Sequence, residues 1–272
     1  NVTVVDVVFE VAGAAANASN AITELMSDTT YGKTWNERIS LKSITAKVGA
    51  DTKEGTFTIV PDSGALTDRP GVSAGNYTVK FSSNDGAYSD VTVFTGSITV
   101  TAKPVTVSGI TANSKSYDGS DTATVNASGA TITGKVDGDD LTVNVATGST
   151  FDSADAGSRT VTLGALTLGG TSVGNYTLAT SGNQTTATAS ITVRDLTVKP
   201  NSGQSKSYGT TPDPVLAYTS IGTVTGETAA FDGALSREAG EDVGTYNITK
   251  GSLALKGSGT FKATNYKLVL DT

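Results

Sequence analysis

The sequence contains no cysteine and no histidine, and it has one methionine and one tryptophan among its 272 residues. Disulfides, thiolate chemistry, imidazole bases and the usual zinc or copper ligand sets are therefore excluded. No apolar run approaches the roughly 20 residues that span a bilayer. No charged segment precedes a short apolar one, as a signal peptide would require. We therefore expect no membrane insertion.

The residues that are abundant favour β-structure. Glycine occurs 31 times, threonine, valine, serine and asparagine are frequent, and only 17% of the residues are charged. This composition is typical of a multidomain all-β protein. The net charge is −7, so neither nucleic acid nor an anionic membrane would be attracted electrostatically. We expect no nucleic-acid partner.

Tyrosines recur along the chain at a fixed spacing. A turn containing Tyr-Gly or Tyr-Asp-Gly occurs at Tyr31, Tyr117 and Tyr208, and the last two are 208 − 117 = 91 residues apart. A second landmark, Asn-Tyr, ends at Tyr176 and Tyr266, which are 266 − 176 = 90 residues apart. A fixed period indicates an array of similar modules. We expect these tyrosines to pack in the cores and to hydrogen-bond a nearby backbone group.

The spacing predicts three tandem repeats, each an immunoglobulin-like β-sandwich built from several short alternating strands. We refer to them as repeat 1 (residues 7–101), repeat 2 (residues 102–194) and repeat 3 (residues 195–272). Only Ala14 to Met26 has the alanine content and apolar stripe of a helix, which we expect as a short insert in repeat 1.

The joints between repeats have a pattern of their own. In residues 97–109 and 190–200, two short apolar alternations are separated by a polar break. Side chains on a strand alternate between two faces, so a change of parity moves the apolar set to the other face. The parity changes at both breaks, from Ile98 and Val100 to Val105 and Val107, and from Ile191 and Val193 to Leu196 and Val198. We interpret each joint as a closing strand that runs directly into the first strand of the next repeat.

The N-terminus repeats this joint pattern without a repeat in front of it. Its parity changes around Asp6, from Val2 and Val4 to Val7, Phe9 and Val11. In repeat 2 the closing strand begins fifteen residues after Tyr176, and the same count in repeat 3 passes the last residue, Thr272. We therefore expect repeat 3 to lack its closing strand and residues 1–6 to be a donor strand.

These features predict head-to-tail assembly of this protein with itself, in which the donor strand of one molecule completes repeat 3 of the next by β-augmentation. Because donor and acceptor lie at opposite ends of the chain, the product would be a pilus-like filament. The alternative is that the 272 residues are a fragment of a longer tandem array. The expected donor residues are Val2, Val4, Val5 and Val7, and the expected acceptor region is Tyr266, Leu268 and Leu270.

Repeats 2 and 3 resemble known families. Lys115-Ser116-Tyr117-Asp118-Gly119, with SADAGSRTVT and GNYTL, is similar to the YDG domain of bacterial surface adhesins. Repeat 3, with SKSYGTTPDP, GALSREAGEDVGTYNIT and NYKL, resembles the companion MBG repeat, and repeat 1 is similar in TYGKTW and SGALTDRPGVSAGNYTV. The resemblance implies tandem β modules, secreted or anchored at the cell surface in stalk-like proteins, some of them credited with adhesion. It implies no catalytic residues.

Other chemistry has weaker support in the sequence. Carboxylates cluster at Asp137, Asp139 and Asp140, and again near Asp152 and Glu238, and calcium could use such oxygens, although none has EF-hand spacing. No phosphate-binding loop occurs, and without histidine no serine triad can form, so we expect no enzyme. A stalk that binds glycan or mucin is the rival interpretation, with Trp35 and Tyr88 as residues that could stack on sugars.

Overall fold

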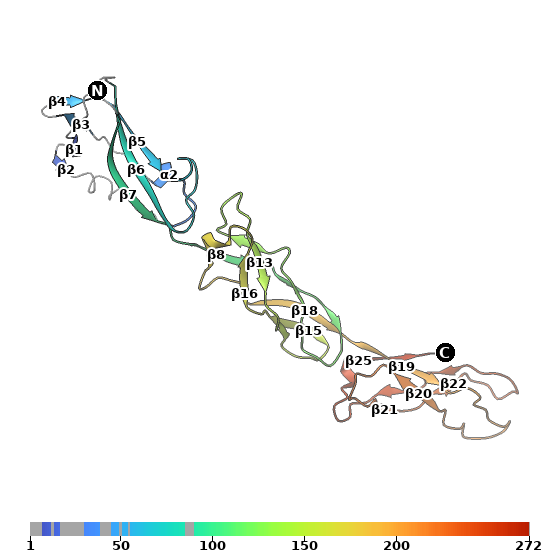
Figure 1. Cartoon of the computed structure of the whole chain (residues 1–272). Coiled ribbons are helices and arrows are strands. Elements are labelled where there is room, and N and C mark those ends of the chain that lie inside the picture. Colours follow the sequence, from blue (N-terminus) through green and yellow to red (C-terminus); the bar gives the residue numbers. More distant parts are fainter. Residues whose placement is uncertain are drawn as a thin grey trace. The chain divides into compact units, whose positions relative to one another are not determined.

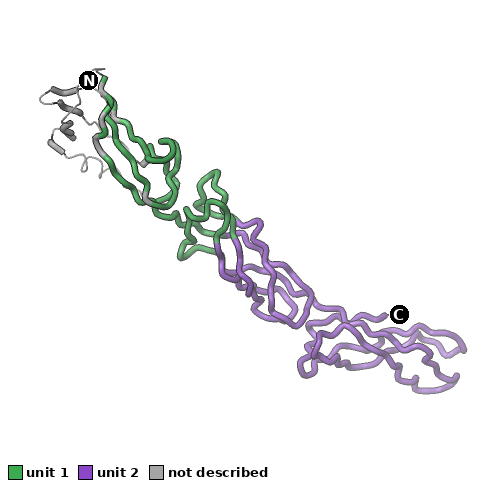
Figure 2. The backbone as a smooth tube through the Cα atoms, viewed as in Figure 1, with its two compact units in different colours: residues 1–107, 131–143, 168–183 green, residues 108–130, 144–167, 184–272 purple. Residues whose placement is uncertain are grey.

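The computed structural model describes residues 7–11, 14–16, 30–38, 45–48, 51–53, 55–84 and 90–271 (Figure 1). These residues form an almost entirely β-structure, and their one α-helix is the short α2 (Trp35–Arg38). The all-β prediction is confirmed. The chain divides into two compact units, unit 1 with residues 1–107, 131–143 and 168–183, and unit 2 with residues 108–130, 144–167 and 184–272 (Figure 2). The predicted number of immunoglobulin-like sandwiches and their boundaries stay a prediction.

Unit 1 begins with a four-stranded antiparallel sheet of order β2-β1-β3-β4, formed by β1 (Val7–Val11), β2 (Ala14–Ala16), β3 (Thr45–Val48) and β4 (Asp51–Lys53). The predicted helical insert is wrong for Ala14–Ala16. These alanines pair with β1, where Ala16 lies opposite Phe9. Alanine has a high helix propensity, but pairing with a sheet overrides local propensity. Residues 17–26 lie outside the described residues.

A second sheet of unit 1 has the order β5-β6-β7, with β5 (Gly55–Pro61), β6 (Ala74–Ser83) and β7 (Val91–Thr99). Alternate residues of β6, Tyr77, Val79 and Phe81, are buried, as period-2 alternation on a half-buried strand requires. Trp35 of α2 is buried in the same core.

The rest of unit 1 comes from repeat 2. The sheet β12-β8-β17 has β8 (Lys103–Ser108) at its centre, flanked by β12 (Thr131–Thr133) and by the parallel strand β17 (Tyr176–Leu178), which follows the 3-10 turn η1 (Val173–Asn175). Val105 on β8 belongs to the same core as Tyr31 and Trp35. Repeat 2 also contains the strand pair β13 (Thr142–Val145) and β16 (Leu166–Gly169), whose residues are divided between the two units.

In unit 2, repeat 2 contributes the sheet β10-β18-β15-β14, formed by β10 (Lys115–Ser116), β14 (Thr150–Phe151), β15 (Gly157–Thr162) and β18 (Thr186–Thr192). The closing strand β18 is central, parallel to β10 and antiparallel to β15. Its residues Ala189 and Ile191 are buried with Val161 of β15. A small pair is formed by β9 (Thr111–Ala112) and β11 (Val125–Asn126).

Repeat 3 completes unit 2. Its main sheet has the order β20-β19-β25, with β19 (Arg194–Pro200) between β20 (Tyr218–Ile221) and the parallel strand β25 (Tyr266–Leu270), which follows the 3-10 turn η2 (Ala263–Asn265). Two short antiparallel pairs accompany it: β21 (Phe231–Asp232) with β24 (Ala254–Leu255), and β22 (Ser236–Arg237) with β23 (Ile248–Thr249).

The predicted joint strands are present. β7 ends at Thr99 and β8 begins at Lys103, while β18 ends at Thr192 and β19 begins at Arg194. The buried set changes parity at each joint as predicted, with the exception of Val193, whose side chain is 44% exposed. Val193 is the single residue between β18 and β19, so the change of face happens at this residue and turns it outward. Within the described ranges, no helix is long and apolar enough to cross a membrane.

Candidate functional site

Two tyrosines from neighbouring repeats meet on one carboxylate in unit 1. The Tyr31 hydroxyl of repeat 1 donates to Asp139 Oδ2 at 3.0 Å, and the Tyr176 hydroxyl of repeat 2 donates to the same oxygen. The Tyr176 oxygen also accepts a hydrogen bond of 3.0 Å from the Val136 backbone N–H. The two rings lie edge to face, with centroids 5.4 Å apart. This joint fixes the end of repeat 1 that carries the Tyr-Gly turn to the start of repeat 2.

Unit 2 repeats this arrangement one repeat later. Tyr117 of repeat 2 and Tyr266 of repeat 3 donate to the two oxygens of Glu227, at 2.6 and 2.7 Å. The Tyr266 oxygen accepts from the Val224 backbone N–H at 2.9 Å, and the rings again lie edge to face at 5.4 Å. The predicted hydrogen bond from the backbone to a buried tyrosine is confirmed at both joints. Its carboxylate partner was not predicted.

The asparagine before each of these later tyrosines forms a second link. Asn175 Oδ1 accepts a hydrogen bond from the Val72 N–H at 3.0 Å, and Asn265 Oδ1 accepts one from the Ala156 N–H at 2.9 Å. Asn265 is fully buried and also donates to Asp155 Oδ1 at 2.9 Å. The Asn-Tyr pair therefore binds the preceding repeat through both of its side chains.

The carboxylate occupies the same place on a turn in both joints. Asp139 follows Val136-Asp137-Gly138 and its N–H bonds the Val136 carbonyl at 3.2 Å. Glu227 stands at the end of the equivalent Val-Thr-Gly-Glu turn, where the corresponding bond to Val224 is 3.0 Å. The signal that was available in the sequence is thus Val-x-Gly followed by an acid. It is short, and it becomes recognisable only once the two turns are seen at equivalent positions.

Burial and the carboxylates keep these hydroxyls protonated. Burial raises the pKa of Tyr117 to about 12, and its hydrogen bond to Glu227 acts in the same direction. Burial likewise raises the pKa of Tyr176 to about 12, with the hydrogen bond to Asp139 as the next cause. A neutral hydroxyl is the form that donates to a carboxylate, so both joints are set as donor and acceptor pairs through the neutral pH range.

The closing strand secures each tyrosine turn from its own repeat. The Tyr31 N–H donates to the Thr101 carbonyl at 2.9 Å, and the Tyr117 N–H donates to the Thr192 carbonyl at 2.8 Å. Tyr31 is 7% exposed and Tyr117 is 4% exposed. Each of these buried tyrosines thus contacts both a strand end of its own repeat and the carboxylate turn of the next repeat.

Tyr208 is the corresponding residue of repeat 3, and its side chain is 75% exposed. The match follows from Lys206-Ser207-Tyr208, which repeats the Lys-Ser-Tyr sequence that ends at Tyr117, and from β22 and β23, which pair as β14 and β15 do. Among residues 195–271, none takes the place that β18 has in repeat 2. That place is an open pocket of about 560 Å³.

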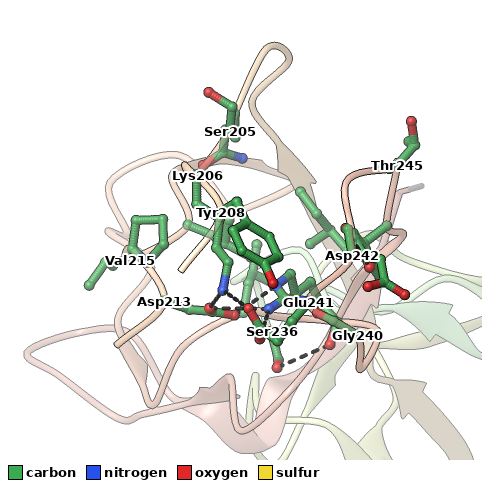
Figure 3. Close-up of a pocket in the computed structure, with 18 of the residues that line it drawn as sticks. Ser205, Lys206, Tyr208, Asp213, Val215, Ser236, Gly240, Glu241, Asp242 and Thr245 are labelled. Carbon is green, nitrogen blue, oxygen red and sulfur yellow. Dashed lines mark hydrogen bonds and ion pairs between the residues drawn. The ribbon is translucent and has the colours of Figure 1, made fainter. Parts of the chain in front are cut away.

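The pocket lies between the two segments that would flank a closing strand. One wall includes Gln204, Ser205 and Lys206, which match the residues leading into Tyr117, and the other includes Tyr246 and Ile248, which match residues of β15. Figure 3 shows Tyr208 and Val215 together with the charged side chains Lys206, Asp213 and Glu241, which also line the pocket. We name this feature the repeat 3 pocket.

The floor of the repeat 3 pocket is a neutralised cluster of charges. Lys206 Nζ lies 2.6 Å from Asp213 and 2.7 Å from Glu241, and Arg237 pairs with the same two carboxylates at 2.7 Å each (Figure 3). The hydrogen bond from Lys206 is the first cause that lowers the pKa of Asp213, followed by that from Arg237. The apolar residues Val215 and Val243 also line the pocket and are 87% and 92% exposed. Exposed valines around an open strand position are typical of an interaction surface.

The predicted donor residues are only partly described. Val2, Val4 and Val5 lie outside the described residues. Val7 begins β1, and its register partner is Val48 of β3. The donor role of residues 1–6 stays a prediction.

The predicted acceptor residues lie elsewhere than the pocket. Tyr266 is buried in the joint with repeat 2, and Leu268 and Leu270 are half-buried on β25 next to β19. None of these three lines the repeat 3 pocket. The predicted acceptor region stays a prediction, and the pocket is lined by the segments that contain Lys206 and Ile248.

The residues considered for sugar stacking and calcium have other roles where they are described. Trp35 is buried, and its ring lies so close to Gly75 that a Cβ there would be 2.9 Å away. Tyr88 lies outside the described residues. Asp139 binds the two tyrosines, and Asp140 accepts hydrogen bonds from Thr171. The described part of the chain holds no group of three or more acidic side chains that could bind a metal ion.

Two family models match the chain. The model of the YDG domain matches residues 101–187, and that of the MBG domain (YGX type) matches residues 196–271. The predicted resemblance of repeats 2 and 3 is therefore confirmed, while that of repeat 1 stays a prediction. No curated protein and no solved structure matches the chain.

Proposed function

Because the chain carries a YDG domain followed by an MBG domain of the YGX type, we propose that it is a non-enzymatic structural protein of the cell surface. Both domains belong to adhesin-like, repeat-containing proteins. We further propose that it is a filament subunit that assembles head to tail by donor-strand complementation. The occupant of the repeat 3 pocket is then the N-terminal strand of a second copy.

The observation that carries this proposal is the repeat 3 pocket itself. In repeat 2 the equivalent position holds β18, which pairs on both sides and buries Ala189 and Ile191. An open strand position exposes unpaired backbone groups, and an added strand satisfies them with main-chain hydrogen bonds while side-chain pockets select the sequence. The exposure of Tyr208, Val215 and Val243 supports an added strand at this place.

The two occupied joints give the register of such a strand. The residue whose carbonyl binds the tyrosine N–H precedes the first buried residue of the next repeat by four positions: Thr101 precedes Val105, and Thr192 precedes Leu196. Because this interval is the same in both joints, the position of the closing strand at the tyrosine turn also fixes where the next repeat begins. A donor strand therefore brings its own repeat to the tyrosine turn.

Applied to the N-terminus, this interval makes a specific assignment. If Val7, the first apolar residue after the parity change at Asp6, takes the place of Val105 and Leu196, then Thr3 takes the place of Thr192, and its carbonyl accepts the Tyr208 N–H of the other copy. Val2 then takes the place of Ile191 in the pocket.

Magnitudes limit what this strand can do alone. Burial of one valine is worth about 1.5 to 3 kcal/mol, and each ladder hydrogen bond adds about 0.5 to 1.5 kcal/mol. Association costs about 4 to 15 kcal/mol. The strand therefore sets the register, and further contact between repeat 1 of one copy and repeat 3 of the other must stabilise the filament.

Electron microscopy of the purified chain tests the proposal. The wild type should form filaments, and a variant with Val2→Asp and Val4→Asp should stay monomeric with an unchanged circular dichroism spectrum. The added carboxylates would lose the apolar contact of the valines, and they would enter a pocket that already holds Asp213 and Glu241. Asn1→Asp is the matched control, since it adds charge at the same end without removing a valine, and it should still assemble. A wild type that remains monomeric at millimolar concentration would contradict the proposal.

A further inference from the structure

The closing strands of repeats 1 and 2 share a short sequence. It reads Gly-Ser-Ile-Thr-Val at residues 96–100 and Ala-Ser-Ile-Thr-Val at residues 189–193. The isoleucine is buried in both strands, and the small residue two positions before it points to the same face of the strand. Each closing strand thus presents one small and one branched aliphatic residue to the core of its repeat.

The neighbouring strand of repeat 1 explains this choice of residues. Across β6 and β7, Ile98 lies opposite Gly75, and Gly96 lies opposite Tyr77. Tyr77 is fully buried, and Ile98 Cγ1 lies 3.8 Å from the point where a Cβ of Gly75 would be. In each of these cross-strand pairs, a glycine leaves room for the large side chain that faces it.

Repeat 2 has the same register with a different residue facing the small one. Ile191 lies opposite Gly157, and Ala189 lies opposite Arg159. The side chain of Arg159 is held in place, because its Nε donates to the Asp155 carbonyl at 2.8 Å. In both repeats, therefore, the aliphatic residue of the closing strand faces a glycine, and the small residue faces a long side chain.

Repeat 3 contains the equivalent of this neighbouring strand. Residues 244–248, Gly-Thr-Tyr-Asn-Ile, match residues 157–161, because β23 pairs with β22 as β15 pairs with β14. Gly244, Tyr246 and Ile248 all line the repeat 3 pocket. Apart from the chain neighbours of Gly244, no atom of a described residue lies within 4 Å of the point where its Cβ would be. The place of the aliphatic residue is therefore open in repeat 3.

The Tyr246 ring is held in place at the edge of this opening. Arg237 Cζ lies 4.9 Å from the ring centroid, and the ring is so close to Gly240 that a Cβ would not fit there. The Tyr246 hydroxyl donates to the Asp242 carbonyl at 2.8 Å. A ring held by these three contacts cannot move away from an incoming strand, so a large side chain opposite it would be overpacked.

From this register we infer that the repeat 3 pocket selects an extended peptide segment by two of its side chains. A branched aliphatic residue lies over Gly244, and glycine or alanine, two positions earlier, lies against Tyr246. The inference rests on the proposed role of the pocket as a strand acceptor and names the sequence that it selects. In the proposed assembly, Val2 of the second copy takes the place over Gly244.

The two sides of the pocket also set the direction of the segment. In repeat 2 the closing strand is parallel to β10 and antiparallel to β15, and the Ser190 N–H donates to the Ser114 hydroxyl at 3.0 Å. Ser205 of the pocket (Figure 3) matches Ser114, because each stands directly before a Lys-Ser-Tyr sequence. The segment therefore runs parallel to residues 205–207 and antiparallel to residues 244–249. Its residue between the two selected side chains donates its N–H to Ser205.

A fluorescently labelled peptide with the sequence of residues 93–101 tests the inference, because it carries both selected side chains. Fluorescence anisotropy measures its binding to the full chain, which is kept dilute and monomeric. Gly96→Val in the peptide should weaken binding at least about tenfold, since the added side chain is overpacked against the Tyr246 ring. Thr95→Val is the matched control. It adds the same side chain on the opposite face of the strand and should bind as the parent peptide does.

Variants of Tyr246 show whether this ring makes the selection. Tyr246→Ala should bind the parent peptide and the Gly96→Val peptide with affinities within about twofold of each other, because the overpacking is relieved. Tyr246→Phe keeps the ring and should keep the preference for glycine. Circular dichroism checks that both variants fold. The peptide series on the wild-type chain tests the selection without any change to the protein.

The outcomes separate this inference from the proposed filament. Equal binding of the glycine and valine peptides to the wild type, or no binding of the parent peptide at millimolar concentration, would overturn the inference and leave observed filaments standing. A preference for glycine that persists in folded Tyr246→Ala would also overturn it. Selective peptide binding by a chain that never forms filaments would support the inference and overturn the proposed assembly.

Discussion

Tyr117 and Tyr208 follow the same Lys-Ser dipeptide, yet one is 4% exposed and the other 75% exposed. The difference does not come from the turn itself. Tyr117 is covered by its closing strand, which accepts its N–H at Thr192, and by Glu227 of the next repeat. The comparison teaches that these tyrosines are buried by segments that come later in the chain, so each turn is half of a contact whose other half belongs to the next repeat.

The lysine before each tyrosine shows what the two ends share. Lys115 Nζ binds the Asp118 carboxylate at 2.8 Å and the carbonyls of Ser120 and Thr122. Lys206 is similarly enclosed by Asp213 and Glu241. The charged side chains at the open end of repeat 3 are therefore already paired. This end lacks only a closing strand and the carboxylate turn of a following repeat. Pre-organisation of this kind lowers the cost of binding.

Removing a buried side chain from the closing strand of repeat 2 should have the largest effect on stability. Ile191→Ala should lower the free energy of unfolding of repeat 2 by about 2 to 5 kcal/mol, because it leaves a cavity beside Val161. Denaturant unfolding of the full chain measures it. Val193→Ala, at an exposed position of the same joint, should cost less than about 1 kcal/mol. Equal losses in both variants would mean that β18 does not build this core.

Removing the tyrosine hydroxyl should distinguish the occupied end from the open end. In dilute, monomeric protein Tyr117→Phe should lower the free energy of unfolding by about 1.5 to 3 kcal/mol, since it leaves the half-buried Glu227 with one hydrogen bond fewer. Tyr208→Phe should change it by less than about 0.5 kcal/mol, as expected of an exposed side chain. Comparable losses at both positions would contradict the assignment of Tyr208 as unpartnered.

Supplying the donor strand within the same molecule should convert the open end into a closed one. Residues 1–6 appended after Thr272 through a flexible linker should fill the repeat 3 pocket, raise the free energy of unfolding of repeat 3 by about 1 to 2 kcal/mol, and block assembly. The same extension with aspartate in place of Val2, which takes the place of buried Ile191, is the control and should do neither. Filaments that still form from the first variant would argue against the pocket as the acceptor.

A change of pH within the physiological range should have the smallest effect on stability, because the tyrosine hydroxyls ionise only at strongly alkaline pH. The folded-state pKa values of Tyr117 and Tyr176 are raised to about 12 from an ordinary value of 10.0. The stability that these neutral hydroxyls contribute is therefore fully present below pH 10 and is lost as the pH rises through 12. Absorbance of tyrosinate and circular dichroism, measured together, should show both joints intact at pH 9. Ionisation of all tyrosines near pH 10 without unfolding would contradict the burial of these two.

Features that depend on the period of the tyrosines and on the parity of the apolar residues could be predicted from the sequence. The tyrosine spacing, the all-β class and the continuous strands at the joints can be predicted from local patterns, and Tyr266 indeed accepts a backbone hydrogen bond. The tyrosine and carboxylate pairs could not be read in this way. Tyr31 and Asp139 are 108 residues apart, so only the folded chain brings them together, and a single acid in a glycine turn has no distinctive local signal.

Two local errors have physical causes of the same kind. Ala14 to Ala16 have helical propensity, but the free edge of β1 recruits them as a strand. Val193 continues the apolar alternation, but the crossing from β18 to β19 turns it outward. Pairing partners, which a sequence does not specify by itself, decide both. The acceptor region Tyr266, Leu268 and Leu270 stays a prediction, and none of its residues lines the pocket formed by residues 204–206, Tyr246 and Ile248.

Hydrogen exchange of the Tyr208 backbone amide tests most directly whether assembly completes the third repeat as β18 completes the second. In repeat 2 the equivalent N–H is bound to the Thr192 carbonyl at 2.8 Å, so the Tyr117 amide should be protected at every concentration. The Tyr208 amide should exchange like an open loop in dilute protein and become protected, to a degree approaching that of Tyr117, when the chain assembles. Rapid exchange of the Tyr208 amide in fully assembled protein would contradict the account.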